Sequence, residues 1–222
     1  ADRGSGHFRK GEVRIDARHV IAVTIDEDGD AAHVQTYVYL SDVPIDAGKA
    51  RTFQLFLWKD LPQARVPRLP GTDDPYYTDA QWAKFRLSSK SHWDVPVNTP
   101  AGVVHFLVSH PTPPVFDGPE NRNGLRNADE IRFWHEYISP GARPWLCDDQ
   151  GTCGGLAGDA RFVIAGDLNS DPNDGDSLHE AIVEVLEHPR VLRHATPKSE
   201  GAVVAAREKG GANLTQRGSP AH

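Results

Sequence analysis

In the stretch Phe162-Val-Ile-Ala-Gly-Asp-Leu-Asn-Ser-Asp-Pro172, a short apolar strand runs into a turn that presents Asp167 and, two residues later, Asn169. Residues i and i+2 of an extended backbone point the same way, so these two polar side chains are expected to project together from the end of a buried strand. Proteins of the α/β class build their sites at such strand ends. The alternative for both residues is an Asx-turn, in which the side chains cap the following loop.

The bulk composition limits the classes of protein to which the chain can belong. It has 222 residues, enough for one sizeable domain or two small ones. The absence of any run of about 18 apolar residues predicts that no helix spans a membrane. The formal net charge is -7, so bulk positive charge gives no affinity for nucleic acid. A phosphate substrate would therefore have to be held by local cations or by a metal.

The first residues and the cysteines bear on processing and compartment. Residues 1–10 are polar and basic and lack the apolar core of a signal peptide. The chain contains no methionine, so we expect a processed, excised or fragmentary sequence. Cys147 and Cys153 either close a small disulfide loop, as in an oxidising compartment, or remain two unpaired thiols. No CxxC pair is present, which disfavours a zinc site.

Hydrophobic periodicity predicts alternating strands and helices, and hence α/β layering with a mixed sheet. Strands, the first two forming a hairpin, are expected over residues 13–25, 32–40, 52–57, 85–91, 103–108 and 161–165. Helices are expected over residues 78–85, 127–137 and 177–187, the first two capped by Thr78 and Asn127. Residues 200–222 are expected to form a loop or a frayed tail.

Two further places carry residues suited to chemistry. His110 ends a buried strand directly before a proline-rich loop, although a lone histidine there is more often a packed loop residue. The segment 117–127 contains Arg122 and Arg126, whose guanidinium groups suit phosphate oxygens. A solvated loop with a helix cap is the alternative interpretation of this segment.

Two common motifs fail on inspection. Asp167, Asn169 and Asp171 have the spacing that opens a calcium loop, but Pro172 stands where that loop needs glycine. Ser109 precedes a histidine, but the chain has no Gly-x-Ser-x-Gly turn. The sequence therefore disfavours an EF-hand calcium site and serine-hydrolase chemistry.

Longer motifs occur in a fixed order along the chain. They are Phe53-Gln-Leu-Phe-Leu-Trp58, Arg86-Leu-Ser-Ser-Lys-Ser-His-Trp-Asp-Val-Pro-Val97, Ser109-His-Pro-Thr-Pro-Pro-Val-Phe-Asp-Gly-Pro-Glu-Asn-Arg-Asn-Gly124, Glu130-Ile-Arg-Phe-Trp134 and Gly166-Asp-Leu-Asn-Ser-Asp-Pro172. With this set, residues 38–222 resemble the endonuclease/exonuclease/phosphatase superfamily, closest to a bacterial, typically secreted branch. The resemblance implies a partial four-layer α/β sandwich with mixed, mainly antiparallel sheets. It also implies a monomeric, magnesium-dependent phosphoester hydrolase, namely a phosphodiesterase, nuclease or phosphatase.

By resemblance, the candidate residues take roles in the attack of water on phosphorus. Asp167 would orient or deprotonate the water, Asn169 would hold a phosphate oxygen and fix Asp167, and His110 would stabilise the developing charge. The assignment requires that His110 and the Asp167/Asn169 pair meet in one pocket. Three polar residues of the later segment are expected to bind the substrate: Arg122, Asn123 and Arg126.

The chain also departs from the family pattern. Residues 1–37 do not resemble it and are predicted to be a divergent hairpin segment, while residues 38–222 form an incomplete domain. One hypothesis gives the hairpin segment a role in partner contacts. The early metal-binding glutamate has no counterpart, so metal ligands stay unassigned, and the final Ser-Asp-His element is absent. Two hypotheses follow. One is an exported phosphoesterase acting on a small molecule, lipid or nucleic acid; the other is an inactive truncated remnant that only binds a phosphorylated ligand or a partner.

Overall fold

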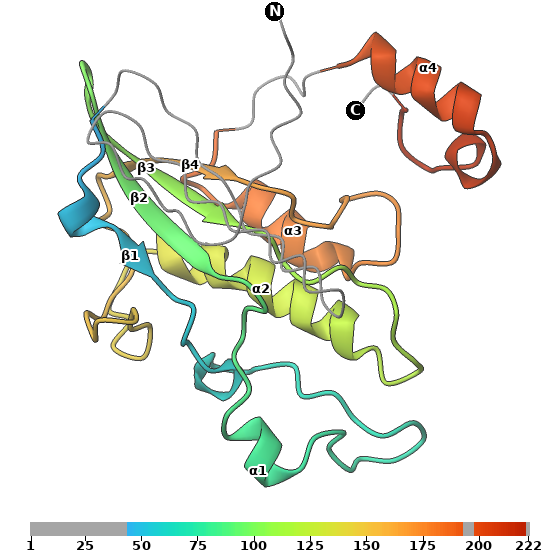
Figure 1. Ribbon diagram of the computed structural model, residues 1–222, viewed down its shortest axis with the longest axis horizontal. Coiled ribbons are helices and arrows are strands. Elements are labelled where there is room, and N and C mark those ends of the chain that lie inside the picture. The colour runs from blue at the N-terminus through green and yellow to red at the C-terminus, as the bar shows by residue number, and fades with distance from the viewer. Residues whose placement is uncertain (1–43, 193–197, 221–222) are drawn as a thin grey trace, which may run out of the picture.

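The computed structural model describes residues 44–192 and 198–220, so the expected hairpin at 1–37 lies outside the described residues. Figure 1 shows the arrangement of the elements. In chain order they are the 3-10 helix Ala47–Lys49, β1 (Arg51–Thr52), the 3-10 helix Trp58–Asp60, α1 (Asp79–Trp82), β2 (His92–Thr99), β3 (Gly102–Ser109), α2 (Arg122–Ile138), β4 (Arg161–Ala165), α3 (His179–Glu187), α4 (Glu200–Lys209) and the 3-10 helix Gly211–Leu214.

The described strands form one mixed sheet in the order β1-β2-β3-β4. β2 and β3 are an antiparallel hairpin that runs from the pair His92↔Ser109 to the pair Thr99↔Gly102, and β1 pairs antiparallel with β2. β4 lies parallel to β3, and α2 is the crossover between these two strands. A mixed, mainly antiparallel sheet with helices confirms the expected α/β class.

The helices α2 and α3 lie side by side against the sheet (Figure 1). α2 buries aromatic residues against β3, with Phe133, Trp134 and Tyr137 packed around Leu107. A second apolar cluster joins the two helices through Ala128, Ile131, Ala181, Ile182 and Val185. Because α2 contacts both the sheet and α3, it holds the two helices as one layer against the sheet, next to the ends of β3 and β4.

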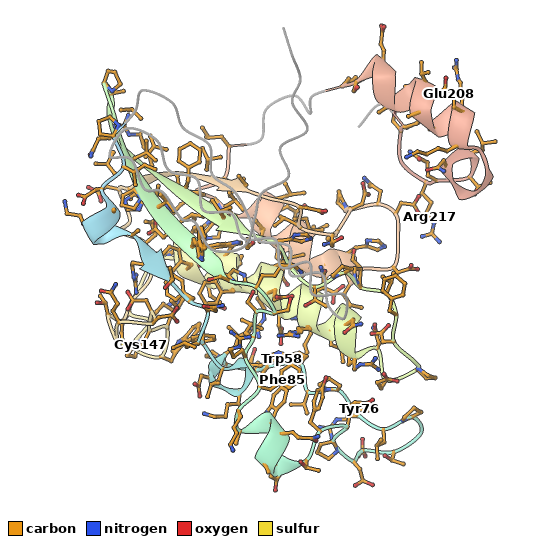
Figure 2. The ribbon with its side chains drawn as sticks, in the orientation of Figure 1. Trp58, Tyr76, Phe85, Cys147, Glu208 and Arg217 are labelled. Atoms are coloured by element: carbon orange, nitrogen blue, oxygen red, sulfur yellow. A yellow bond between two sulfur atoms is a disulfide. The ribbon has the colours of Figure 1, made fainter. Side chains whose placement is uncertain are left out.

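A cluster of aromatic side chains lies in the long segment between β1 and β2, and one of them bonds this segment to α2. The rings of Trp58 and Phe85, labelled in Figure 2, have centroids 5.9 Å apart, and Trp82 lies 5.0 Å from Trp58. The Trp58 indole Nε1 donates to the buried carboxylate of Asp129 at 2.7 Å, so the polar edge of this ring is satisfied. α1 begins after Thr78, whose hydroxyl and Gln81 form the capping box, which confirms the predicted N-cap.

The strand predicted over residues 85–91 is wrong, because β2 begins at His92 instead. The sequence His92-Trp-Asp-Val-Pro-Val97 does not look like a strand, because it contains the polar residues His92 and Asp94, which are buried in the structure. The Asp94 carboxylate accepts from Tyr137 Oη at 2.5 Å and contacts His105 Nδ1 at 2.7 Å. Pro96 is tolerated because the backbone polar groups of this residue face away from β3. Its carbonyl accepts from the Asp46 N–H, so no ladder hydrogen bond to β3 requires an N–H at this position.

Two further boundaries correct the expectations. α2 begins at Arg122 rather than Asn127, so Asn127 is an interior helix residue and not an N-cap. Residues 200–209 form α4, capped by the Ser199 hydroxyl, where a loop or tail was expected. No helix in the described ranges is long and apolar enough to cross a bilayer.

Cys147 and Cys153 form a disulfide, which selects one of the two interpretations that the sequence left open. The loop between them is attached to β1 through Arg51, whose guanidinium donates to Asp148 at 2.7 Å and to the carbonyls of Thr152 and Gly154. The disulfide loop therefore lies beside β1, where Figure 2 labels Cys147.

Candidate active site

The parallel pairing of β3 and β4 brings His110 and Asp167 together. The register places Val108 opposite Ala165, and continuing it by two residues places His110 opposite Asp167. The imidazole Nε2 of His110 lies 3.9 Å from Oδ2 of Asp167. The expected convergence of these two strand ends on one place is therefore present in the structure.

A glycine permits this close approach of the two strand ends. Gly166 has φ +137°, and a Cβ at this position would lie 1.9 Å from the carbonyl oxygen of Ser109. Any other residue would therefore force β3 and β4 apart just before the two functional side chains.

Asn169 fixes the loop that carries Asp167. Its backbone N–H donates to Oδ1 of Asp167 at 3.0 Å, and its side-chain Nδ2 donates to the carbonyl of Pro111 at 3.0 Å. Asn169 adopts φ +50°, a left-handed conformation that asparagine tolerates better than most residues. The Asx-turn offered as the alternative is thus present at Asp167 but not at Asn169. The Asn169 side chain instead joins the Asp167 loop to the loop after His110.

Two buried residues of α2 hold these loops from below, and the sequence reasoning missed both. Asn127 donates through Nδ2 to the carbonyls of Thr112 at 2.9 Å and Leu168 at 3.0 Å. The Glu130 carboxylate accepts the N–H of Thr112 at 2.5 Å and the N–H of Ser89 at 3.3 Å. Their spacing of three residues on one helix face is the signal that could have revealed them.

The charges at the site influence one another. Burial lowers the pKa of the His110 imidazole, Lys90 lowers it further, and Asp167 opposes them. Burial also lowers the pKa of Lys90, against the attraction of Glu130 and Asp167. Burial raises the pKa of Glu130, which is fully enclosed. The Asp167 side chain is 69% exposed, so water reaches it directly.

The residues expected to bind substrate have their donors directed at protein acceptors. Arg122 pairs with Glu120 and donates to the Phe116 carbonyl at 3.3 Å. The side chain of Asn123 donates to the Val115 carbonyl at 2.7 Å. These two residues thus shape the loop that follows His110.

Arg126 lies beneath the segment before β2. It donates to the carbonyls of Leu87 at 2.7 Å and Arg86 at 2.9 Å, and its guanidinium stacks over the Phe85 ring at 4.8 Å. Burial lowers its pKa. The side chains of all three residues assigned to substrate binding donate to protein acceptors, and their role in binding stays a prediction.

A metal ion at this site would need several oxygen or nitrogen ligands from neighbouring side chains. Within residues 44–192 and 198–220, no three His, Cys, Asp or Glu side chains cluster as a metal site would require. At the site itself, the Asn169 carboxamide uses its nitrogen on Pro111, and Asp167 is the exposed carboxylate beside His110. The described residues alone therefore do not fit a metal centre. Carboxylates such as Glu12 and Glu27 lie outside them.

A cavity of about 940 Å³ adjoins the site on one side. It begins at Asn169 and is lined by residues 170–177 and 216–219. The backbone N–H of Arg217 donates to the Asp174 carboxylate at 2.8 Å and so links these two segments. This cavity is large enough for a small organic group.

Comparison with known proteins identifies a family. A sequence model described as the Endonuclease/Exonuclease/phosphatase family matches residues 12–213. No curated protein and no solved structure matches the chain. The match begins inside the segment 1–37, and the domain boundary predicted at residue 37 stays a prediction.

Proposed function

The chain belongs to the endonuclease/exonuclease/phosphatase family, and we propose that it hydrolyses a phosphoester at the site formed by His110, Asp167 and Asn169. The family as a whole performs metal-dependent phosphoester hydrolysis. One observation carries the proposal: the imidazole and the carboxylate, 3.9 Å apart, lie at the carboxyl ends of two adjacent parallel strands.

Each of the three residues supplies one part of an in-line attack by water. Asp167 accepts a hydrogen bond at Oδ1 from the Asn169 N–H, and its Oδ2 faces His110. This exposed carboxylate orients the attacking water and takes its proton. The His110 imidazole donates an N–H to a non-bridging phosphate oxygen and so stabilises the charge that develops there. Asn169 keeps the carboxylate aligned, because its side chain also ties the loop to Pro111.

Magnesium is the divalent ion that we propose for this reaction, because the family depends on metal. Such an ion would act as a Lewis acid and offset the negative charge of the phosphate. The described residues do not make its site, so every step above is assigned to side chains of the protein.

The substrate class is open to a small phosphoester, a lipid or a nucleic acid. The net charge of -7 disfavours tight binding of a duplex without metal. We also propose export to an oxidising compartment, which the Cys147–Cys153 disulfide supports.

The proposal is tested with bis(p-nitrophenyl) phosphate and magnesium. We expect hydrolysis by the chain and a loss of about 10²- to 10⁴-fold for Asp167→Ala, because a general base contributes on that order. The matched control is Asp159→Ala, an exposed acid just before the other end of β4. Equal background rates for the chain and Asp167→Ala would refute hydrolysis and leave the alternative, a remnant that binds phosphorylated ligands.

A further inference from the structure

An anionic substrate needs a cation at this site. The chain carries net charge -7, and the exposed Asp167 carboxylate adds a local negative charge where the phosphate would lie. Two negative charges in contact repel each other more strongly near a protein surface than in bulk water. A positive side chain beside Asp167 would remove this penalty.

The arginines near the site are used by the protein itself. Arg122 pairs with Glu120, and Arg126 donates to two backbone carbonyls in the segment before β2. The charge or the donors of each are therefore already engaged. Lys90 differs, because the hydrogen bond from its Nζ goes to a hydroxyl, Ser89 Oγ, at 3.5 Å.

The fold places Lys90 beside His110. Lys90 comes two residues before β2, and the first pair of the hairpin is His92↔Ser109, so the segments 90–91 and 110–111 lead away from the same end of the pair. Ser89 Oγ lies 3.4 Å from Oγ1 of Thr112, which fixes the two segments against each other.

Glu130 makes this placement rigid. Its buried carboxylate accepts the N–H of Ser89 and the N–H of Thr112, so the residues flanking Lys90 and His110 share one anchor on α2. Lys90 is half-buried, and its charge acts on both His110 and Asp167. A cation that is partly removed from water, weakly bonded by the protein and rigidly mounted gains from binding an anion.

We propose that Lys90 binds the non-bridging oxygens of the phosphate group beside His110 and Asp167. This inference rests on the proposed function for its substrate, but phosphate binding itself needs no turnover. Lys90 holds the phosphate with its ammonium charge, while Asp167 faces it with the attacking water. It is thus a substrate-binding residue within the motif of residues 86–97, to which the resemblance assigned no role.

The first experiment measures binding of inorganic phosphate by titration calorimetry at neutral pH. We expect Lys90→Gln to weaken the affinity about tenfold or more, since a charge-assisted hydrogen bond contributes roughly 1.5–3 kcal/mol. Lys90→Arg keeps the charge and should bind within about threefold of the unchanged chain. The control Lys84→Gln removes an exposed lysine of the same segment and should have no effect. Unchanged affinity in Lys90→Gln, or no phosphate binding by the unchanged chain at millimolar concentration, would overturn the proposal.

A second measurement needs no variant. Acetylation of lysines in the unchanged chain, read by peptide mass spectrometry, should fall at Lys90 but not at Lys84 when millimolar phosphate is present. Equal labelling of Lys90 with and without phosphate would overturn the proposal even where Lys90→Gln does not fold.

The outcomes also separate this inference from the proposed function. Lys90-dependent phosphate binding without hydrolysis by the chain would refute the hydrolase and keep the Lys90 site. Hydrolysis that needs Asp167 but is indifferent to Lys90→Gln in both KM and kcat would do the reverse.

Discussion

Nε2 of His110 lies 3.9 Å from Oδ2 of Asp167, although the whole of α2 separates the two residues along the chain. The pairing comes from the backbone: two parallel strands end at the same edge, and Gly166 lets their ends touch. The relationship therefore depends on the register of β3 and β4 rather than on flexible side chains.

Replacing His110 by glutamine should reduce phosphodiester hydrolysis about 10²- to 10⁴-fold, because the imidazole donor to the phosphate is lost. The melting temperature should change little, since His110 makes its described contact with an exposed carboxylate. His135→Gln, on the far part of α2, is the matched control. A fall in rate for both variants alike would argue against a specific role of His110.

Gly166→Ala should destabilise the fold by about 3 kcal/mol, within the range of severe point mutations. Its Cβ would overlap the Ser109 carbonyl, and φ at this residue is +137°. Gly158→Ala is the control, because a Cβ there meets no atom within 4 Å. Chemical denaturation of both variants checks the difference, and equal midpoints would contradict the tight contact of the strand ends.

His92 should make the fold sensitive to acid. Burial lowers the pKa of its imidazole to about 4, and the ring bonds the Glu130 carbonyl at 2.7 Å. The unfolded chain, with a pKa near 6.5, binds a proton that the folded chain resists, so stability is lost as the pH falls from about 6.5 to about 4. The full loss from this group is about 3 kcal/mol.

The measurement compares melting temperatures across that pH range for the unchanged chain and for His92→Gln, which keeps a donor toward Glu130. The melting temperature should fall less steeply with decreasing pH in His92→Gln than in the unchanged chain. His110 and His188, whose pKa values burial also lowers, contribute in the same direction in both proteins. Glu130, whose pKa is raised, contributes the opposite sign. Parallel curves for the two proteins would show that His92 is not the sensitive group.

Reduction of the Cys147–Cys153 disulfide should lower stability by about 2 kcal/mol, because the loop it closes is short. The released loop includes the Asp148 and Thr152 acceptors of Arg51, so β1 loses support as well. Thermal unfolding with and without reductant measures the effect, with the double variant Cys147→Ser, Cys153→Ser as a control that ignores reductant. Hydrolysis should stay unchanged, because this loop lies beside β1; a parallel loss of rate would show that it supports the site.

The sequence predicted β3 and β4, whose ends carry the site, better than it predicted β2. β4 spans Arg161–Ala165 as expected, since five apolar-rich residues precede a glycine turn. β2 was missed because Asp94 and His92 look like loop residues until their partners Tyr137 and the Glu130 carbonyl are known. Those partners are on α2, and the hydrophobic pattern of a short segment does not reveal contacts with residues distant in the sequence.

The same limit applies to the candidate site. His110, Asp167 and Asn169 could be selected because each follows a strand. Arg122 and Arg126 were selected for their chemistry, but a guanidinium serves backbone carbonyls as well as it serves phosphate, and the structure shows the former contacts. Lys90 lies inside the motif of residues 86–97, but nothing in that motif assigned it a role. Its position becomes informative once the hairpin register is known.

The anchor on α2 has a consequence for natural variation. Glu130 accepts from the main-chain N–H groups of Ser89 and Thr112, and the Thr112 side chain also hydrogen-bonds to it. Both positions need a main-chain N–H, which excludes proline, and the hydroxyls of Ser89 and Thr112 also contact each other. Position 130 is more restricted still, because its one carboxylate anchors both segments. Mutational tolerance in this region should thus be lowest at a residue that no ligand touches, and a survey that ranks residues by contact with substrate would overlook it.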